Sequence, residues 1–388
     1  MTDIPKTQRV AVYYNNRDVR IEERPVPKIG PGEVLVKVLA SGICGSDVLE
    51  WYRIKKAPIV LGHEIAGEIV QVGEGVAKHK VGDRVAVNHH VPCNTCPYCL
   101  AGHHTACETL HTTAFDPGGF AEFVRVPALQ TDRGVYPLPE GVSFEEGSFA
   151  EPLGCVVRGQ RSVALKPGQN VAVLGAGVSG ILHIALAKAV GAGRILATDI
   201  DKFHLDLARR FGADEAFEAR GDPSTLRQAQ GRPEQGREAT GSGSPLVRPR
   251  GSRRGAGSRG DVPRLLRKAN GGRGLDLVVV CCGALSAFAQ ALASVDRGGT
   301  VLCFATTDPG VELRVPLNEF WRNDVTLKPS YANSPHDATT ALELIAARRV
   351  PVAEMITHRL PLERTQEGFR LMSTAGGENL KVVILPHG

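Results

Sequence analysis

The chain has 388 residues, of which 42% are apolar, so it is long enough and apolar enough to fill the cores of two domains. It contains no run of eighteen apolar residues, and residues 1–10 lack the apolar stretch of a signal peptide, so we expect a cytoplasmic protein without membrane contact. The net charge of +5 arises in residues 220–260, which hold nine Arg and three acidic residues, so the nearly neutral remainder indicates no nucleic-acid partner.

Residues 1–156 alternate short apolar runs with Gly and Pro residues. Residues 31–38, which begin with Pro31 and Gly32, and residues 65–73, which contain Gly67 and Gly73, are examples. Period-two patterning that is interrupted at such spacing predicts a β-rich domain.

Three short stretches of this first domain carry possible metal ligands. The first contains Cys44, the second contains His63 and Glu64, and the third contains Glu151. A single residue of these types is more often part of a core or a surface. Together the three stretches supply S, N and O ligands for one zinc ion with an exchangeable position, which is the composition of a catalytic site.

Residues 93–107, here called the cysteine loop, predict a second metal site. Cys93, Cys96, Cys99 and Cys107 form the pattern C-x-x-C-x-x-C-x7-C. Two-residue spacers bring sulfurs to one side of successive turns, and four thiolates fill a tetrahedral zinc site completely. We therefore predict a structural zinc, with an iron–sulfur cluster as the alternative. The odd total of nine cysteines also favours metal binding and free thiols over a disulfide framework.

From Lys166 onwards, short apolar strands alternate with helices, which is typical of a parallel sheet covered by helices on both faces. The predicted strands are 170–174, 194–198, 276–281, 300–305 and 324–328. The predicted helices are 178–190, 202–211 and 262–269, the first two of which are followed by glycine.

A glycine-rich turn joins the first of these strands to the first helix. Gly175 permits the tight turn, Gly177 lets the backbone approach a pyrophosphate, and Gly180 lets helix and strand pack closely. The helix that begins at Val178 then offers free N–H groups and a positive dipole to the phosphates. Asp199 ends the next strand, where an acid can bind both ribose hydroxyls and repel a 2′-phosphate, so we predict NAD rather than NADP.

Residues 220–260 interrupt this alternation, because they contain no aromatic residue and are dominated by Gly, Arg, Ser, Pro and Gln. Such a segment buries too little apolar surface to offset the entropy that ordering costs, so we interpret it as a disordered insert. An electrostatic tether to an acidic partner is the alternative. Beyond about residue 333 we predict a helix at 337–347 and a strand at 381–385 that rejoins the first domain.

The chain resembles the zinc-containing medium-chain alcohol dehydrogenase family, especially its sorbitol and threonine dehydrogenase branches. The resemblance covers nearly the whole chain apart from the insert. It is carried, in family order, by 42–47, 62–67, 81–85, the cysteine loop, 151–153 and the glycine-rich turn. It implies an α/β fold with a GroES-like, β-rich catalytic domain at 1–156 and 333–388, a Rossmann domain with a doubly wound parallel sheet at 157–332, and a substrate cleft at their junction.

The resemblance also implies a mechanism, in which a secondary alcohol gives a hydride to NAD. Cys44 and His63 correspond to the fixed ligands of the catalytic zinc, and Glu64 to a ligand that exchanges with water or substrate. Glu151 replaces the second Cys of simple alcohol dehydrogenases, as in the polyol branch, so we expect a polyol-like substrate. Ser46 is placed to take the alcohol proton first.

One departure from the family touches this proton path. Many relatives have His three residues after the Ser or Thr, whereas this chain has Leu49, which cannot carry a proton. His90 resembles a histidine that threonine dehydrogenases place near substrate, so an amino alcohol remains an alternative substrate. Lys381 stands where relatives have a basic residue near the cofactor phosphates.

Two other functions compete with a zinc alcohol dehydrogenase. One is a non-enzymatic zinc regulator that binds nucleic acid through the Arg-rich tract, and the other is a zinc-free quinone or enone reductase of the same superfamily. The expected partners are a small-molecule alcohol and further copies of the chain. The resemblance implies a homotetramer or homodimer that pairs through the strand near 324–328.

Overall fold

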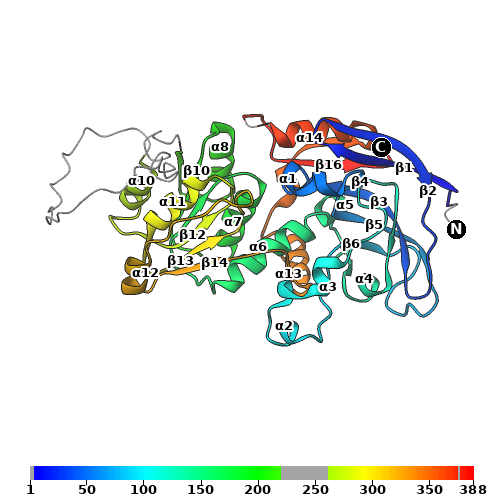
Figure 1. Cartoon of the computed structure of the whole chain (residues 1–388), viewed down its shortest axis with the longest axis horizontal. Coiled ribbons are helices and arrows are strands. Elements are labelled where there is room, and N and C mark those ends of the chain that lie inside the picture. Colours follow the sequence, from blue (N-terminus) through cyan, green and yellow to red (C-terminus); the bar gives the residue numbers. More distant parts are fainter. Residues whose placement is uncertain (1–3, 220–260, 375) are drawn as a thin grey trace, which may run out of the picture.

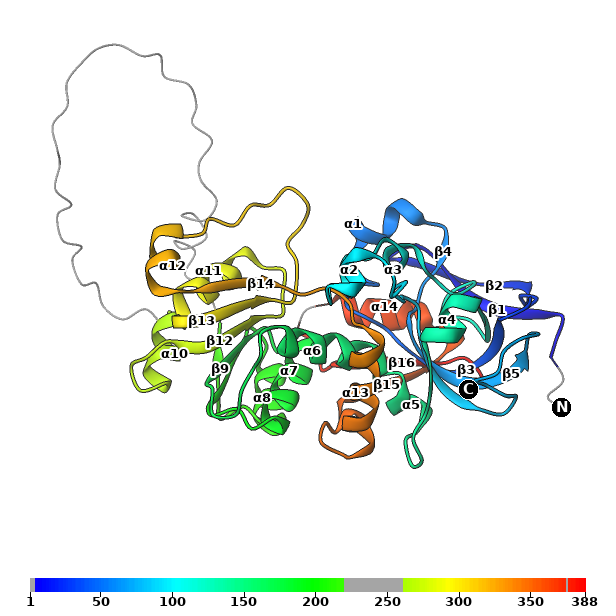
Figure 2. The ribbon, with the colours of Figure 1, turned by 90° about the horizontal axis from the view of Figure 1, so that it is seen from below.

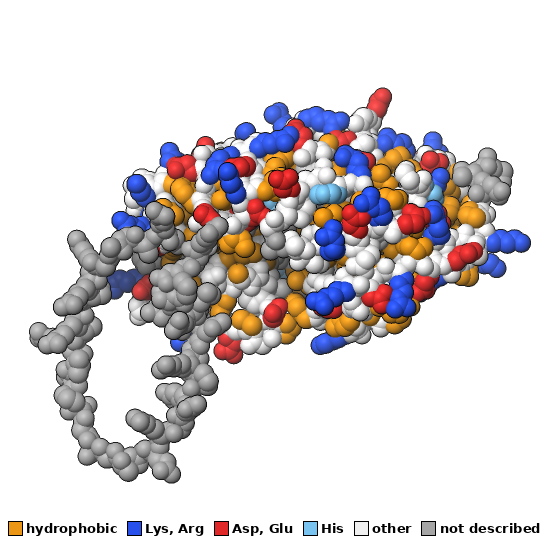
Figure 3. Space-filling view, turned by 90° about the horizontal axis from the view of Figure 1, so that it is seen from above, with side chains coloured by type: hydrophobic (Ala, Val, Ile, Leu, Met, Phe, Trp, Pro, Cys, Tyr) orange, Lys and Arg blue, Asp and Glu red, His pale blue; other side chains and the backbone are white. Residues whose placement is uncertain are grey.

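The computed structural model describes residues 4–219, 261–374 and 376–388, and it forms two lobes that lie side by side (Figure 1). The predicted insert at 220–260 lies outside the described residues. None of the described helices is both long enough and apolar enough to cross a bilayer. Basic and acidic side chains are mixed over both lobes on the face of the molecule that Figure 3 shows.

The β-rich lobe contains two sheets and is built from both ends of the chain. The smaller sheet has the order β2-β1-β4, from Asp18–Pro25, Thr7–Asn15 and Ile59–Val60. The larger sheet has the order β15-β16-β3-β5-β6-β8, and β7 also pairs with β3. Its strands are β15 (Ile356–Pro361), β16 (Lys381–Leu385), β3 (Val34–Gly42), β5 (Glu64–Val72), β6 (Arg84–Asn88), β8 (Val135–Pro137) and β7 (Phe123–Val126). Strand β16 pairs antiparallel with β3, so the end of the chain completes the sheet that its beginning started.

Short helices surround these sheets. They are α1 (Glu50–Arg53), α2 (Pro97–Leu100), α3 (Glu108–Thr112), α4 (Ala128–Arg133), α5 (Phe144–Gly147), α13 (Pro335–Ala346) and α14 (Thr365–Ser373). Helix α13 begins with a capping box, in which the side chains of Ser334 and Asp337 each accept a hydrogen bond from the other residue's backbone N–H.

The Rossmann lobe is a six-stranded parallel sheet with the order β11-β10-β9-β12-β13-β14. The strands are β11 (Glu215–Glu218), β10 (Ile195–Asp199), β9 (Val171–Leu174), β12 (Leu275–Val280), β13 (Val295–Cys303) and β14 (Thr326–Pro329). The helices are α7 (Val178–Ala189), α8 (Lys202–Phe211), α10 (Val262–Ala269), α11 (Leu285–Ser294) and α12 (Leu317–Asn323). Every residue of β9 is buried, as expected for a parallel strand covered on both faces.

Two cores cover the two faces of this parallel sheet. On one face, side chains of α7 and α8 pack with those of α6 (Ala150–Ser162), which joins the two lobes. On the other face, α10, α11 and α12 bury their apolar side chains. The predicted α/β fold with a β-rich and a Rossmann part is therefore confirmed.

Two predicted strand limits are wrong near the end of the Rossmann sheet. Strand β13 begins at Val295 rather than at residue 300. Strand β14 begins at Thr326 rather than Asp324, because Asp324 adopts a left-handed conformation (φ 54°) that ends the unpredicted helix α12.

Candidate active site and zinc centres

The pairing of two antiparallel strands brings together three of the predicted metal ligands. Gly42 at the end of β3 is paired with Glu64 at the start of β5, so Cys44 and His63, which flank this pair, lie next to it. One possible ligand atom from each of Cys44, His63 and Glu64 lies within 4.8 Å of the others. A thiolate, an imidazole and a carboxylate at this separation are suited to one zinc ion.

Asp47 orients the histidine of this group. It is completely buried, and its carboxylate oxygen Oδ1 lies 3.2 Å from His63 Nδ1. Its other oxygen accepts a hydrogen bond from the Cys44 N–H at 3.1 Å. A carboxylate that holds Nδ1 leaves Nε2 as the metal-binding nitrogen, as is common in zinc sites. The contact between Asp47 and His63 therefore supports the fit of these residues to a metal ion.

Lys381 lies in a different place from the one predicted beside the cofactor phosphates. It is completely buried, and its ammonium group forms an ion pair with Glu64 Oε2 and a 3.1 Å hydrogen bond to the Ile43 carbonyl. Gly42 makes room for this pair, because a Cβ there would lie only 2.1 Å from Glu64 Oε2. The prediction failed because position along the chain does not show which way the side chain of β16 points.

Glu151 lies at the start of α6 but outside the close group of three ligands. The Cys155 thiol, one helical turn further on, donates a 3.4 Å hydrogen bond to its Oε1. Burial raises the pKa of the Glu151 carboxyl. The structure thus places Glu151 in the lining of the same cavity as Cys44 and His63, without making it a member of the tightest group.

A cavity of about 190 Å³, here called the catalytic cavity, opens between the lobes beside these residues. Both lobes line it, with Cys44, Ser46, His63, His90 and Glu151 from one and Ser179, Phe304, Ser330 and Tyr331 from the other. Residues from both lobes therefore contribute to one site. Figure 2 shows the end of β14 directed toward α2 and α3, where the rings of His111 and Tyr331 stack.

Arg53 holds the predicted proton acceptor in place. Its guanidinium donates hydrogen bonds of 3.0 Å to the carbonyl oxygen and to the hydroxyl oxygen of Ser46. It also donates to Asp47 Oδ1 at 3.4 Å. The positive guanidinium beside Oγ stabilises this oxygen when the hydroxyl gives up its proton.

His90 also lines the catalytic cavity, on the side toward the cysteine loop. Its Nδ1 lies 3.0 Å from the Thr113 carbonyl oxygen, which can only accept a hydrogen bond. Nδ1 is therefore the protonated nitrogen and donates a hydrogen bond to this oxygen. Burial lowers the pKa of His90 to about 4. The ring is therefore neutral at physiological pH and leaves Nε2 as a hydrogen-bond acceptor.

The cysteine loop folds around its four sulfurs, which also lie within 4.8 Å of one another. Backbone N–H groups point at these sulfurs, as in the bonds of 3.2 Å from Cys96 to Cys93 and 3.3 Å from Cys93 to Cys107. Hydrogen bonds from Thr95 and Cys96 lower the pKa of Cys93 to about 5, which favours the thiolate. Four convergent sulfurs with donors aimed at them fit a closed structural zinc site.

The glycine-rich turn has the geometry that a dinucleotide requires. Gly175 has a φ of +93°, and a Cβ on Gly180 would lie 2.0 Å from the Gly175 carbonyl oxygen. Asp199 accepts hydrogen bonds from the Ala176 N–H at 2.6 Å and the Asp201 N–H at 2.9 Å. Although burial opposes it, hydrogen bonds from His204 and Ala176 lower the pKa of Asp199, so this carboxylate is ionised at neutral pH.

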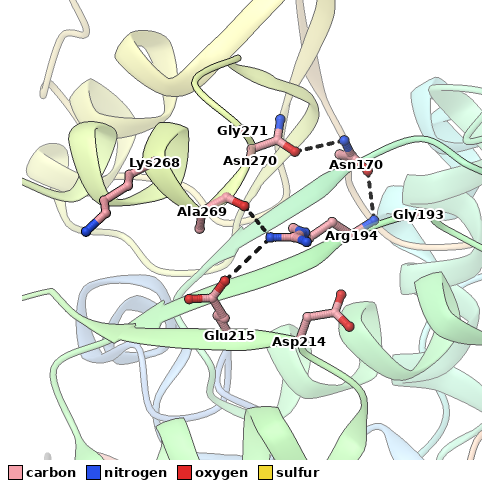
Figure 4. A pocket seen from close by; sticks show the side chains of 9 residues that line it. All are labelled: Asn170, Gly193, Arg194, Asp214, Glu215, Lys268, Ala269, Asn270 and Gly271. Atoms are coloured by element: carbon pink, nitrogen blue, oxygen red, sulfur yellow. Dashed lines mark hydrogen bonds and ion pairs between the residues drawn. The ribbon is translucent and has the colours of Figure 1, made fainter.

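Another cavity, of about 870 Å³, lies at the opposite end of the Rossmann strands (Figure 4). Its polar groups bind one another: Asn170 donates to Asn270 at 2.8 Å, and Arg194 contacts the Ala269 carbonyl and Glu215. In parallel sheets, ligands bind at the carboxyl ends of the strands, whereas these residues precede β9, β10 and β12 or begin β11. We therefore place the active site at the catalytic cavity.

Two sequence profiles match this chain. The alcohol dehydrogenase GroES-like domain matches residues 30–140, and the zinc-binding dehydrogenase profile matches residues 179–347. The chain belongs to the zinc-containing medium-chain alcohol dehydrogenases. The dehydrogenase is 31% identical to sorbitol dehydrogenase of Bacillus subtilis over 99% of both chains. It is 32% identical to a probable D-xylulose reductase A of Emericella nidulans, over 95% of this chain and 94% of the relative.

Similar solved structures agree with this family assignment. An alcohol dehydrogenase of Thermus sp. ATN1 has a TM-score of 0.77 and 29% identity, covering 97% of the dehydrogenase and 99% of that chain. The 2R,3R-butanediol dehydrogenase of Bacillus subtilis has a TM-score of 0.76 and 25% identity, covering 98% and 99%. A zinc-binding dehydrogenase of Sinorhizobium meliloti, bound to NADP, has a TM-score of 0.76 and 26% identity, covering 98% and 100%.

Sequence reasoning missed two residues of the site. Asp47 lies inside the motif that contains Cys44, so its place in the motif was the signal that could have indicated a role. Arg53 had no such signal, because a lone Arg seven residues after Ser46 is typical of a solvated helix end. Only the turn into α1 brings its guanidinium back to Ser46.

Proposed function

We propose that this dehydrogenase oxidises a secondary hydroxyl of a polyol with NAD as hydride acceptor. The observation that carries the proposal is the group of Cys44, His63 and Glu64, with Glu151 beside them, at a cavity shared by both lobes. The names of the relatives, sorbitol dehydrogenase and D-xylulose reductase, support a polyol substrate. The domain limits predicted from the sequence are part of this proposal, and the sheet to which each strand belongs supports them.

In this proposal Cys44 and His63 hold a zinc ion, and Glu64 is the ligand that exchanges. Zinc supplies a Lewis acid that lowers the pKa of an alcohol bound to it. The chain itself contributes orientation, because Asp47 fixes the imidazole and Lys381 fixes one oxygen of Glu64.

Ser46 is the proposed acceptor of the alcohol proton. Ser46 lines the catalytic cavity, and its Oγ accepts a hydrogen bond from Arg53, which favours the onward transfer of the hydroxyl proton. Leu49 offers no path, since its side chain has no titratable group. We propose that the proton leaves through the cofactor ribose, Glu64 or the adjacent His89 and His90 rings, whose centroids are 3.6 Å apart.

An amino alcohol is the second candidate substrate. The observation that favours it is the neutral His90 at the cavity wall, because its Nε2 can accept a hydrogen bond from an ammonium group. A polyol hydroxyl can donate the same bond. Removal of this acceptor should therefore lower the oxidation rate of an amino alcohol and that of a polyol by different amounts.

Purified, zinc-loaded enzyme tests the function directly. We expect NAD-dependent oxidation of sorbitol or xylitol with kcat/KM at least about tenfold above that of threonine, a margin of about 1.4 kcal/mol. His90→Ala is expected to reduce the threonine rate more than the sorbitol rate. A substrate order with threonine first would favour the amino-alcohol function, and no turnover of any alcohol would refute both.

The proposed NAD preference depends on Asp199. Because a charge-assisted hydrogen bond contributes about 1.5–3 kcal/mol, Asp199→Ser should lower the NAD over NADP preference in kcat/KM by about 10- to 100-fold. Asp206→Ser, which removes an exposed acid of α8 instead, is the matched control and should change the preference less than about twofold. Equal preferences in wild type and Asp199→Ser would contradict the assignment.

The proposed structural zinc makes a separate prediction about stability. Cys93→Ser should remove one zinc per chain and lower the thermal midpoint by more than about 5 °C, because four ligands hold the cysteine loop together. Zinc content and thermal unfolding measure the two effects. Loss of activity without any change in the midpoint would assign this zinc to catalysis instead.

We also propose a homodimer or homotetramer that pairs through β14, at the edge of the Rossmann sheet. Leu317 and Trp321 of the neighbouring α12 are 74% and 80% exposed, which is a large apolar surface to leave in water. A location in the cytoplasm is part of the proposal, and the free thiols of the described cysteines support it.

A further inference from the structure

A second cavity, here called the Arg158 cavity, adjoins the catalytic cavity on the side of the cysteine loop. Its volume is about 600 Å³, and it shares Phe304, Ser330 and Tyr331 with the catalytic cavity. Arg158 is its one charged lining residue among the described parts of the chain. A molecule that reacts in the catalytic cavity can therefore extend past these three shared residues toward a positive charge.

Helix α6 sets the distance between the two cavities. Glu151, Cys155 and Arg158 are spaced by four and three residues, so they lie on one face of the helix. The first two line the catalytic cavity, and the third lines the Arg158 cavity. Seven residues of helix place Arg158 roughly 10 Å along the axis from Glu151, which suits the far end of an extended polyol.

Arg158 is half-buried and forms no ion pair with any acidic residue of the described ranges. Its one hydrogen bond in the described structure is donated by Nη2 to the Thr105 hydroxyl at 2.8 Å, and its buried Nε has no acceptor there. Asp337 is the neighbouring acid, but its Oδ1 is already held by Arg161 at 2.8 Å. Burial lowers the pKa of Arg158, yet an Arg side chain stays charged at neutral pH.

A charge that is partly removed from water without a counter-ion is costly, so the Arg158 cavity favours an anion. Hydroxyl groups reinforce the preference. The buried Ser330 Oγ has no hydrogen-bond partner in the described structure, and Thr306 and Thr307 also line the cavity. A guanidinium that shares its cavity with a free serine hydroxyl matches the oxygens of a phosphate or carboxylate.

We propose that the Arg158 cavity binds an anionic end of the substrate, so that the preferred substrate is a polyol that carries a phosphate ester or a carboxylate group. This inference rests on the proposed polyol oxidation. Arg158 and Ser330 hold the anion, and the oxidised hydroxyl lies at the catalytic cavity. Arg158 thereby acts as a specificity residue for the end of the substrate that does not react.

The test compares NAD-linked oxidation of sorbitol, sorbitol 6-phosphate and gluconate. We expect the wild type to favour at least one of the two anionic substrates over sorbitol by at least about tenfold in kcat/KM, and the favoured anion identifies the group. Arg158→Met should lower kcat/KM for that anion by about 30-fold, mostly through KM, because charged hydrogen bonds in the ground state are lost. An unchanged ratio of anionic to neutral substrate in Arg158→Met would overturn the proposal.

Two further variants serve as a control and as an alternative for this test. Arg209→Met removes an exposed Arg of α8 that pairs with Asp206, and it should leave the ratio unchanged within about twofold. If Arg158→Met does not fold, Thr105→Val removes only the hydroxyl that positions the guanidinium and should raise KM for the anion by about threefold.

A binding measurement separates the two proposals. If no alcohol is oxidised, the proposed function fails, but calorimetric titration with sorbitol 6-phosphate still tests the Arg158 cavity. Binding to the wild type that is at least about tenfold weaker in Arg158→Met supports the subsite, and equal binding to both proteins refutes it.

Discussion

Replacement of Cys44 by Ser should lower kcat by at least about a thousandfold, which corresponds to about 4 kcal/mol of lost transition-state stabilisation. The physical reason is the loss of the thiolate from a group that holds only one sulfur, one imidazole and one carboxylate within 4.8 Å. Zinc content should fall from two ions to one per chain at the same time. Steady-state kinetics with sorbitol and elemental analysis measure both effects.

Cys281→Ser is the matched control for this prediction. Cys281 is a free cysteine of the Rossmann core that belongs to neither close group of ligands, so it makes the same atomic change without touching a proposed metal site. We expect two zinc ions per chain and kcat within about twofold of wild type. Full activity and full zinc content in Cys44→Ser would exclude Cys44 as a ligand.

Replacement of Lys381 by Met should lower the free energy of unfolding by about 3–5 kcal/mol, because it leaves the buried Glu64 carboxylate without its partner. Both side chains are essentially inaccessible to water, so solvent cannot compensate for the lost charge. Urea unfolding of the zinc-loaded enzyme measures the change. We also expect a weaker hold on zinc, because Glu64 loses the contact that fixes one of its oxygens.

Lys78→Met provides the comparison. Lys78 pairs with Asp132 on the surface, where both side chains are at least half exposed, and such pairs contribute at most about 1 kcal/mol. Equal losses of stability in Lys78→Met and Lys381→Met would show that the Glu64 pair is not the buried, stabilising contact seen here.

The sequence was most informative where local physics decides the structure. Helix α8 and strand β16 have the predicted limits, because a turn or cap close in sequence bounds each of them. For α8 this cap is Gly212. The limits of β13 and β14 were less accurate. They depend on a left-handed Asp324 and on pairing between strands, neither of which leaves a pattern in the residues themselves.

The same contrast holds at the site. The motifs around Cys44 and His63 predicted that these side chains would come together, and the structure brings them together with Glu64. Their binding of zinc stays a prediction. The Lys381–Glu64 pair joins residues 317 positions apart, so no local pattern could indicate it. Arg158 likewise gains its meaning only when α6 and the cysteine loop enclose a cavity.

A crystal structure with anomalous data collected at the zinc absorption edge tests the central claim most directly. The claim predicts one peak at bonding distance from both Cys44 and His63, roughly 2.3 Å from sulfur and 2.0–2.1 Å from nitrogen, and a second among the four sulfurs of the cysteine loop. A map with a peak in the cysteine loop and none between Cys44 and His63 would contradict it.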